Sequence, residues 1–508
     1  MIRRPLPTLG VAHPSGRVLP AGYPHFVPRS VRPPVLPSGF LPVVGVLALV
    51  FTLGPNWPLA WLSLAVLVAG VALTWRPGEP AGLLFIFVMQ WLEASIAIFM
   101  AQSSGRHINE LAQLSMADMQ GATILSLVGL LVLFAGVRLA AGPPNQRILQ
   151  RARAEATLLR ADRMAMIYVA VSLAALVAHE LSGLVPGLRQ PLLAAANLKW
   201  AAYVALTAAA FLQGGAMKRL FYVVFAVEFV LSLGGYFSSF KMIFIYTFIG
   251  LLAAQVRPTV PRLVGAGLLT ALAILVGITW SAVKNDFRSY ASGGQGQVVL
   301  VDWTDRMSYL GDLVLAVDGD ALADGADRLA RRLTYVEFFG AAMNFVPEAT
   351  PHTGGALWAD AASRPFMPRI LFPGKSVVDE SALTNRYTGL GVAGWEQGTQ
   401  ISIGYVGEAY IDFGPLGMMV PMALLGLALG YAYRRTLTVE PFRGLLGLAL
   451  CVPLVMTLYT VNLSAIKGVG GFATTVLVLF AFRRIGGPTA RRWLDHSMRG
   501  ASLRQSRT

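Results

Sequence analysis

The sequence has a single cysteine, Cys451, among 508 residues. One thiol cannot form a disulfide within the chain, and it cannot supply the clustered thiolates of structural zinc sites or iron–sulfur clusters. Cys451 itself lies in an apolar stretch near the C-terminus. Any order in the polar segments must therefore come from packing rather than from disulfides.

Charged residues are also scarce. They make up 13% of the chain, whereas 55% is hydrophobic and the mean hydropathy is +0.60. An average soluble protein contains about 25% charged residues. Apolar runs of roughly 16–22 residues recur along the whole length, which is typical of helices that cross a bilayer. The composition therefore predicts an all-α polytopic membrane protein.

The hydropathy pattern predicts about twelve transmembrane helices, with eleven or thirteen as alternatives. They lie near residues 40–55, 57–75, 81–101, 119–141, 164–186, 192–213, 219–236, 241–256, 261–283, 414–433, 442–461 and 469–482. Nine helices thus occupy a segment from 39 to 283 and three a segment from 414 to 482. The polar stretch between them, residues 284–413, is expected to form one large, mostly helical loop. Residues 1–38 are expected to be a disordered basic tail, and residues 483–508 a second basic tail.

The basic residues indicate the orientation, because Lys and Arg gather in cytoplasmic segments. If both termini are cytoplasmic, 26 of the 41 basic residues fall in inner segments. The short outer loops then contain only Arg106, Arg189 and Lys467. The sequence therefore predicts cytoplasmic termini and a large outer loop.

The formal net charge of +15 does not indicate a nucleic-acid partner. The outer loop contains 16 acidic and 10 basic residues, so the positive excess lies beside the predicted spans. Membrane topology and anionic lipids account for such a distribution. Membrane lipids are therefore expected partners, and nucleic acid is not.

Several ionisable residues fall inside the predicted spans, where they are costly and usually functional. Most of them lie at mid-depth or in the outer half, which favours a polar cavity that opens beneath the loop. The alternative is that they form structural ion pairs, such as Glu228 with Lys199. These residues are Glu93, His179, Glu180, Lys199, Glu228 and Lys241.

Three motifs in the loop do not meet the requirements of known sites. "PGKS" at 373–376 lacks the first glycine of a phosphate-binding loop, since Arg369 occupies that position. His352 has no second ligand at metal-binding spacing, and "AVDGDALADGADRLARR" lacks the spacing of an EF-hand. Leu322, Leu329 and Leu333 of that stretch instead suit an amphipathic helix on the membrane domain.

Basic residues recur through the loop despite its acidic balance. Lys284 and Arg288 are four residues apart and so share one helix face. Arg and Lys are the side chains that bind phosphate, so these residues could hold a lipid-linked diphosphate. The alternative is that they pair with the loop's own carboxylates. The further candidates are Arg306, Arg331, Arg332, Arg369, Lys375 and Arg386.

Two stretches carry a family resemblance: "PRILFPGKS" at 368–376 and "GYVGEAYIDFGPLG" at 404–417, which leads into a span. Together with the many spans and the late outer loop, they resemble the bacterial oligosaccharide repeat-unit polymerases of the Wzy or O-antigen polymerase type. "SSFK" at 238–241 is similar to a further motif of that family. The matching residues are Pro368, Arg369, Pro373, Lys375, Gly407, Glu408, Tyr410, Asp412, Phe413, Gly414, Gly417 and Lys241; Asp412 stands where the family usually has Asn.

The resemblance implies a metal-independent glycosyltransferase of the bacterial inner membrane whose large loop is periplasmic and which needs no cofactor. Its donor and acceptor would be undecaprenyl-diphosphate-linked glycans, with a chain-length regulator as a candidate partner. Arg369 and Lys375 would contact the diphosphate, and Glu408 would accept a proton. Lys241, Arg288, Arg306, Arg331, Arg332, Arg386 and Tyr410 are expected to bind the diphosphate or the glycan.

Three alternatives stay open at this point. A ligase that transfers a finished glycan to another acceptor would use the same donor and similar cations. A transporter of lipid-linked sugars would need polar residues through the whole membrane depth, and a non-catalytic assembly subunit would tolerate changes to the cations. For Glu408, the alternative is a structural role at a helix N-terminus, where a carboxylate favours the helix dipole.

Overall fold

The apolar stretches fold into α-helices, in which a segment without water satisfies its own backbone hydrogen bonds. The computed structural model describes residues 44–46, 48, 53–113, 117–233, 240–254, 260–294, 299–369, 371–376, 378–394 and 399–505. These residues form helices and connections without a β-strand, and they belong to one compact unit. The all-α prediction is therefore confirmed for this part of the chain.

The helices of the first half of the chain are α2 (Trp57–Thr74), α3 (Gly82–Ser104), α4 (Met119–Ala141), α5 (Gln146–Leu158), α6 (Ala161–Leu184), α7 (Arg189–Ala196), α8 (Lys199–Gln213), α9 (Gly215–Leu233) and α10 (Phe240–Ala253). Those of the second half are α11 (Val260–Ser292), α12 (Trp303–Leu315), α13 (Gly319–Leu333), α14 (Val336–Phe345), α15 (Ala356–Ser363), α16 (Glu380–Thr388), α17 (Tyr405–Gly417), α18 (Met419–Thr438), α19 (Leu445–Val455), α20 (Ala465–Arg484) and α21 (Gly487–Gln505). Short 3-10 helices occupy Ile108–Leu111, Pro186–Leu188, Arg364–Phe366 and Met456–Leu458.

Seven of the described helical segments are long and apolar enough to cross a membrane. They are α2, α3, α4, α6, the continuous Pro186–Gln213 segment of α7 and α8, Gly267–Ser292 of α11, and α20. An eighth is added if α17 and α18 count as one broken span. These helices identify the chain as a helical membrane protein.

The structure differs from the twelve-span prediction in several places. The first predicted span lies largely outside the described residues. The helix near 219–236, α9, carries Lys218, Arg219 and Glu228. The apolar helices near 241–256 and 442–461 are only Lys241–Ala253 and Leu445–Leu458. Helix α9 is therefore too polar to count as a simple span, and the other two helices are too short.

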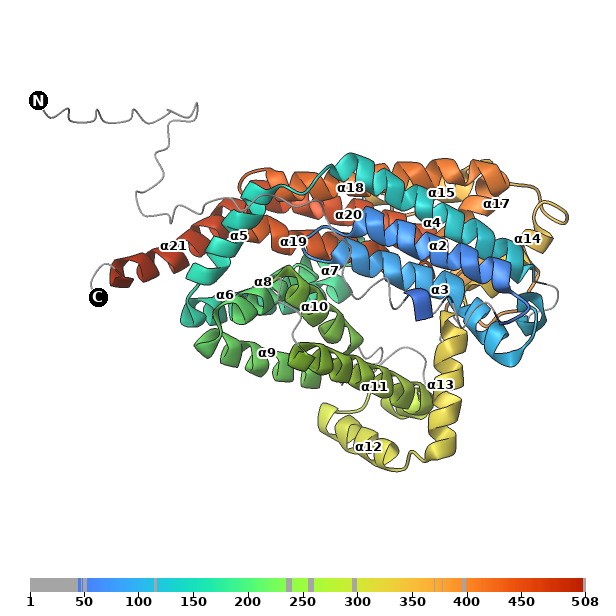
Figure 1. The fold of residues 1–508 in the computed structure, drawn as a ribbon, viewed down its shortest axis with the longest axis horizontal. Coiled ribbons are helices and arrows are strands. Elements are labelled where there is room, and N and C mark those ends of the chain that lie inside the picture. The colour runs from blue at the N-terminus through green and yellow to red at the C-terminus, as the bar shows by residue number, and fades with distance from the viewer. Residues whose placement is uncertain are drawn as a thin grey trace, which may run out of the picture. The chain divides into compact units, whose positions relative to one another are not determined.

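Helices α4 and α18 pack along much of their length and lie side by side with α2 and α3 (Figure 1). Their approach depends on glycine. A Cβ on Gly426 would lie 2.0 Å from the carbonyl oxygen of Leu133, and one on Gly430 would lie 2.4 Å from that of Val137. Gly426 and Gly430 are four residues apart, the spacing with which small residues allow membrane helices to pack backbone to backbone.

We expect Gly426→Ala to lower the free energy of unfolding by about 1–3 kcal/mol or more, the usual cost of inserting a methyl group into a packed interior. The backbone of α4 cannot move aside as a flexible side chain would. The matched control is Gly183→Ala on α6, where the added Cβ meets nothing within 4 Å. Thermal unfolding of both variants in detergent tests this, and equal midpoints would contradict the packing argument.

The chain bends sharply where α17 meets α18, at an angle of 116°. Gly414 adopts φ 72°, ψ −175°, a conformation that only glycine adopts without strain, and Pro415 follows it. The predicted span at 414–433 therefore corresponds to α18, Met419–Thr438, and the "GEAYIDF" stretch forms a separate, largely buried helix before it. The resembling motif thus lies inside the protein, packed against other helices.

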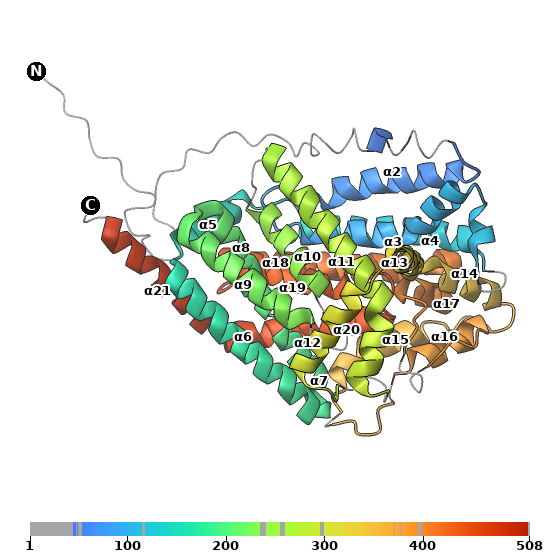
Figure 2. The ribbon, with the colours of Figure 1, turned by 90° about the horizontal axis from the view of Figure 1, so that it is seen from below.

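Helices α6 to α13 lie beside the α2–α3–α4–α18 group in Figure 1, whereas α14 and α17 contact α4 directly. Helix α8 contacts α6, α9, α10 and α19, while α11 packs against α12 and α13 (Figure 1 and Figure 2). A second, small hydrophobic cluster around Val283, Phe287 and Leu310 joins α11 to α12. Helix α11 continues to Ser292, so the predicted loop starts as an extension of a span.

Candidate functional site

Five basic side chains from three helices lie close together. Lys241 is the second residue of α10, Lys284 and Arg288 are one turn apart on α11, and Arg328 and Arg332 are one turn apart on α13. Arg332 is near enough to repel both Lys241 and Lys284, and Arg288 and Arg328 also repel Lys284. We call these five residues the cation cluster.

The cation cluster has few negative partners. Within the described residues, Lys241, Lys284, Arg328 and Arg332 have no carboxylate within the 4.0 Å of a salt bridge. Arg331, by contrast, pairs with Asp327 at 2.6 Å on the exposed side of α13. Basic side chains that lack carboxylate partners can bind carboxylate or phosphate oxygens, so the cluster is suited to an anionic ligand.

Helix α13 is held rigidly against α11. A Cβ on Gly325 would lie 2.6 Å from the carbonyl oxygen of Ile278, so the two backbones are in direct contact. This packing fixes Arg328 and Arg332 relative to Lys284 and Arg288. The amphipathic pattern of the predicted helix is confirmed, and its basic residues form part of the cluster rather than only a solvated face.

Lys241 connects the cation cluster to the main core. Its ammonium lies 5.6 Å from the centre of the Tyr459 ring, and Glu93 of α3 attracts it. Glu93 is buried and accepts hydrogen bonds from the Thr460 hydroxyl at 2.5 Å and the Val461 N–H at 2.9 Å. Glu93 therefore anchors the connection between α19 and α20 beside the cluster.

The same connection, residues 459–465, also contacts Glu408. One carboxylate oxygen of Glu408 accepts a hydrogen bond of 3.0 Å from the N–H of Ala465, the first residue of α20. The other oxygen is buried and has no hydrogen-bond partner among the described residues. Gly404 packs so closely that its Cβ would lie 2.4 Å from the Val461 carbonyl oxygen. Glu408 thus binds the N-terminus of α20 through one oxygen, while its second oxygen is enclosed by protein without a described partner.

The side chains of Asp412 and Tyr410 form hydrogen bonds within the protein. Asp412 accepts hydrogen bonds from the N–H groups of Leu357 and Trp358, at 3.1 and 2.8 Å, and so caps the start of α15. The Tyr410 ring is buried and its hydroxyl donates to the Val346 carbonyl at 3.0 Å. The structure therefore places Tyr410, expected to contact glycan, in the protein interior.

Arg369 and Lys375 lie in a separate loop next to α15. The Lys375 ammonium donates to the carbonyl oxygens of Arg364 and Met367 at 2.7 and 3.0 Å, which closes the loop. Burial, together with the nearby charge of Arg364, lowers the pKa of Lys375. Arg369 is exposed and donates to the Ser376 carbonyl at 3.4 Å. No described contact joins this loop to the cation cluster.

The remaining candidates are dispersed. Lys199 pairs with Glu228 at 3.0 Å, the ion pair considered as the structural alternative, and Tyr168 donates to Glu228 at 2.7 Å. His179 and Glu180 are exposed on α6. The structure therefore does not bring the six ionisable residues of the predicted cavity into one site.

Two further loop cations lie apart from these groups. Arg306 lies on α12 with its guanidinium near the Asp302 carbonyl, and Arg386 lies over the ring of Tyr387. Neither Arg306 nor Arg386 is among the basic residues that repel Lys241 or Lys284.

Sequence reasoning did not single out Arg328, Glu380 or Tyr459. Arg328 precedes Arg332 by one helical turn, and that spacing could have identified it. Glu380 is buried beside Glu408, and its carboxylate accepts hydrogen bonds from the Ser464 hydroxyl and the Lys467 ammonium. These partners are 84 and 87 positions away in the sequence. No local sequence pattern predicts the contacts of Glu380 with Ser464 and Lys467, or the contact of Tyr459 with Lys241.

Residues 83–435 match a family described as a domain of unknown function, DUF8712. No curated protein and no solved structure matches the chain. The matched region includes the cation cluster, Glu93 and Glu408, and it ends before the 459–465 connection that contacts them. Because this region spans more than half of the sequence, the chain belongs to the DUF8712 family.

Proposed function

We propose that this protein polymerises undecaprenyl-diphosphate-linked oligosaccharide repeat units into a bacterial surface or secreted polysaccharide. The observation that carries the proposal is the cation cluster, in which four of five basic side chains have no salt-bridge partner among the described residues. A diphosphate leaving group needs such cations, because they stabilise the negative charge that develops on it. The resemblance of 368–376 and 404–417 to repeat-unit polymerases supports the same reaction.

In the proposed reaction, a sugar hydroxyl of one lipid-linked unit attacks the anomeric carbon of another. The new glycosidic bond forms as the bond from that carbon to the diphosphate oxygen breaks, and the electron pair leaves with the lipid diphosphate. The cation cluster holds the departing diphosphate. A base accepts the proton of the attacking hydroxyl, and we assign this role to Glu408.

Two observations favour Glu408 over Glu93 as the base. Its second oxygen has no hydrogen-bond partner in the described chain, whereas both oxygens of Glu93 are occupied by the 459–465 connection. That connection also contacts Lys241 through Tyr459. Glu408 and the cation cluster are therefore linked through one short segment, which supports a common site.

The proposal includes a membrane arrangement. We propose that α9, α10 and α19 also cross the bacterial inner membrane, giving about twelve spans with the first predicted one. Both termini would be cytoplasmic and residues 284–413 would lie in the periplasm, where the undecaprenyl-linked substrates are used. The distribution of basic residues supports this orientation.

The test is a size analysis of glycans in the organism that encodes the protein, comparing a deletion strain with the same strain complemented by the wild-type gene. We expect the deletion to retain single lipid-linked repeat units and to lose the ladder of longer chains. Long chains that accumulate on the lipid carrier would instead indicate a ligase. Repeat units that accumulate only on the cytoplasmic side would indicate a transporter.

A further inference from the structure

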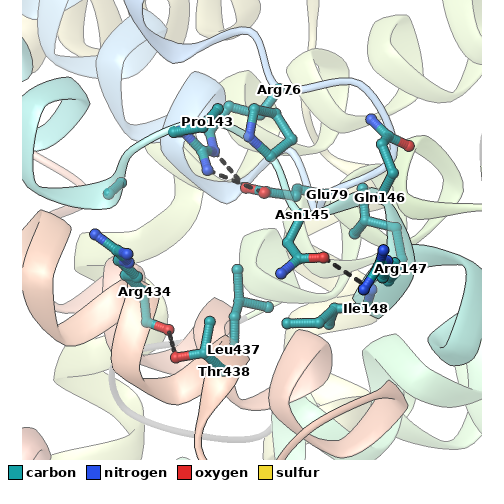
Figure 3. A pocket seen from close by; sticks show the side chains of 13 residues that line it. Arg76, Glu79, Pro143, Asn145, Gln146, Arg147, Ile148, Arg434, Leu437 and Thr438 are labelled. Atoms are coloured by element: carbon teal, nitrogen blue, oxygen red, sulfur yellow. Dashed lines mark hydrogen bonds and ion pairs between the residues drawn. The ribbon is translucent and has the colours of Figure 1, made fainter. Parts of the chain in front are cut away.

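A cavity of about 500 Å³ lies where α4 ends, α5 begins and α18 ends (Figure 3). The N-terminus of α4 lies at the opposite end of that helix, where the Asp118 N–H donates to the Gly340 carbonyl at 3.3 Å. Its polar lining includes Arg76, Glu79, Asn145, Arg147, Arg434 and Thr438. None of these residues belongs to the proposed glycosyl-transfer site.

The charge of the cavity is positive. The Arg76 guanidinium donates to the Glu79 carboxylate and, at 2.6 Å, to the Gly142 carbonyl, so Arg76 and Glu79 neutralise each other. Arg147 and Arg434 lie on opposite sides of the cavity (Figure 3). Neither guanidinium has a hydrogen-bond or ion-pair partner in the part of the chain that the structure describes. Two solvent-exposed arginines without a described partner thus line one cavity that is open to solvent.

The start of α5 adds donors to the same wall. The Asn145 side chain caps the Ile148 N–H at 3.3 Å, while the N–H groups of Gln146 and Arg147 in the first turn have no described acceptor. Guanidinium N–H groups of arginine and backbone N–H groups at helix N-termini both donate hydrogen bonds to phosphate oxygens. The cavity therefore offers donors of both kinds to one anion.

The position of the cavity indicates where that anion comes from. Helix α4 ends at Ala141 and α18 at Thr438, and α4 is long and apolar enough to cross the membrane. The ends of spanning helices lie at the level of lipid head groups. We propose that Arg147 and Arg434 bind a phosphate group in this cavity, and the depth favours an anionic lipid head group as its source.

The purified full-length protein in dodecyl maltoside provides the test. The thermal midpoint is measured with added phosphatidylglycerol, with phosphatidylcholine, and with sodium phosphate. The test variant is Arg147→Gln combined with Arg434→Gln. The matched control is Arg435→Gln, because Arg435 follows Arg434 on α18 and its guanidinium donates to the Tyr431 hydroxyl at 2.9 Å.

We expect phosphatidylglycerol to raise the midpoint of the wild type and of the control, and the double variant to need about tenfold more lipid, as expected when charge-assisted hydrogen bonds are lost. Sodium phosphate that reproduces the stabilisation would support the phosphate site and identify a soluble source. Equal stabilisation of the double variant and the wild type would overturn the proposal. Stabilisation by phosphatidylcholine alone would also overturn it, because that lipid has no net charge.

Discussion

Replacing Arg332 by alanine is expected to reduce chain elongation by about 10²-fold or more, the usual effect of removing one group that stabilises developing charge. Arg332 is near both Lys241 and Lys284 and has no salt-bridge partner among the described residues. Removing it relieves repulsion between like charges. The thermal midpoint of Arg332→Ala should therefore equal or exceed that of the wild type.

The neighbouring Arg331 provides the control. It forms an exposed pair with Asp327, and such pairs contribute at most about 1 kcal/mol to stability. Arg331→Ala should therefore leave the glycan ladder intact at normal protein level. The measurement is the length distribution of glycans together with the thermal midpoint of each purified variant. Equal loss of elongation in both variants would show that the cation cluster is not the diphosphate site.

Glu408→Gln is expected to reduce elongation by about 10²–10⁴-fold, the range in which a general base contributes. The amide keeps an oxygen that can accept the hydrogen bond from the Ala465 N–H, so the fold should persist. What the substitution removes is the capacity to take up a proton. Loss of long glycans with an unchanged thermal midpoint is the expected combination.

Asp412→Asn, one helical turn away, distinguishes a base from a structural carboxylate. Asp412 receives N–H groups of α15 on both carboxylate oxygens, and asparagine places an NH₂ group against one of these donors. We expect a lower thermal midpoint and a loss of activity no larger than the loss of folded protein. If Glu408→Gln behaves in the same way, Glu408 is structural and another group accepts the proton.

The basic residues show where the roles implied by the resemblance differ from the geometry. The resemblance assigns the diphosphate to Arg369 and Lys375, but two of the three N–H donors of Lys375 are used to close their own loop. Arg332 lies outside the resembling motif, yet it is near Lys241 of α10. A motif identifies residues that recur in a family, whereas ligand binding also requires donors that the protein itself leaves unused.

The sequence alone determined the class of the protein, because bilayer-spanning helices satisfy their hydrogen bonds locally and so appear as apolar runs. It also indicated the pairing of Lys199 with Glu228 and the amphipathic helix α13. Only the tertiary structure decided that Lys241, Lys284 and Arg332 converge, that Asp412 caps α15, and that α17 is bent away from α18. The first two features depend on contacts between residues far apart in the chain, and no local pattern of side chains encodes such contacts. The bend depends on the backbone conformation of Gly414, which hydropathy does not reveal.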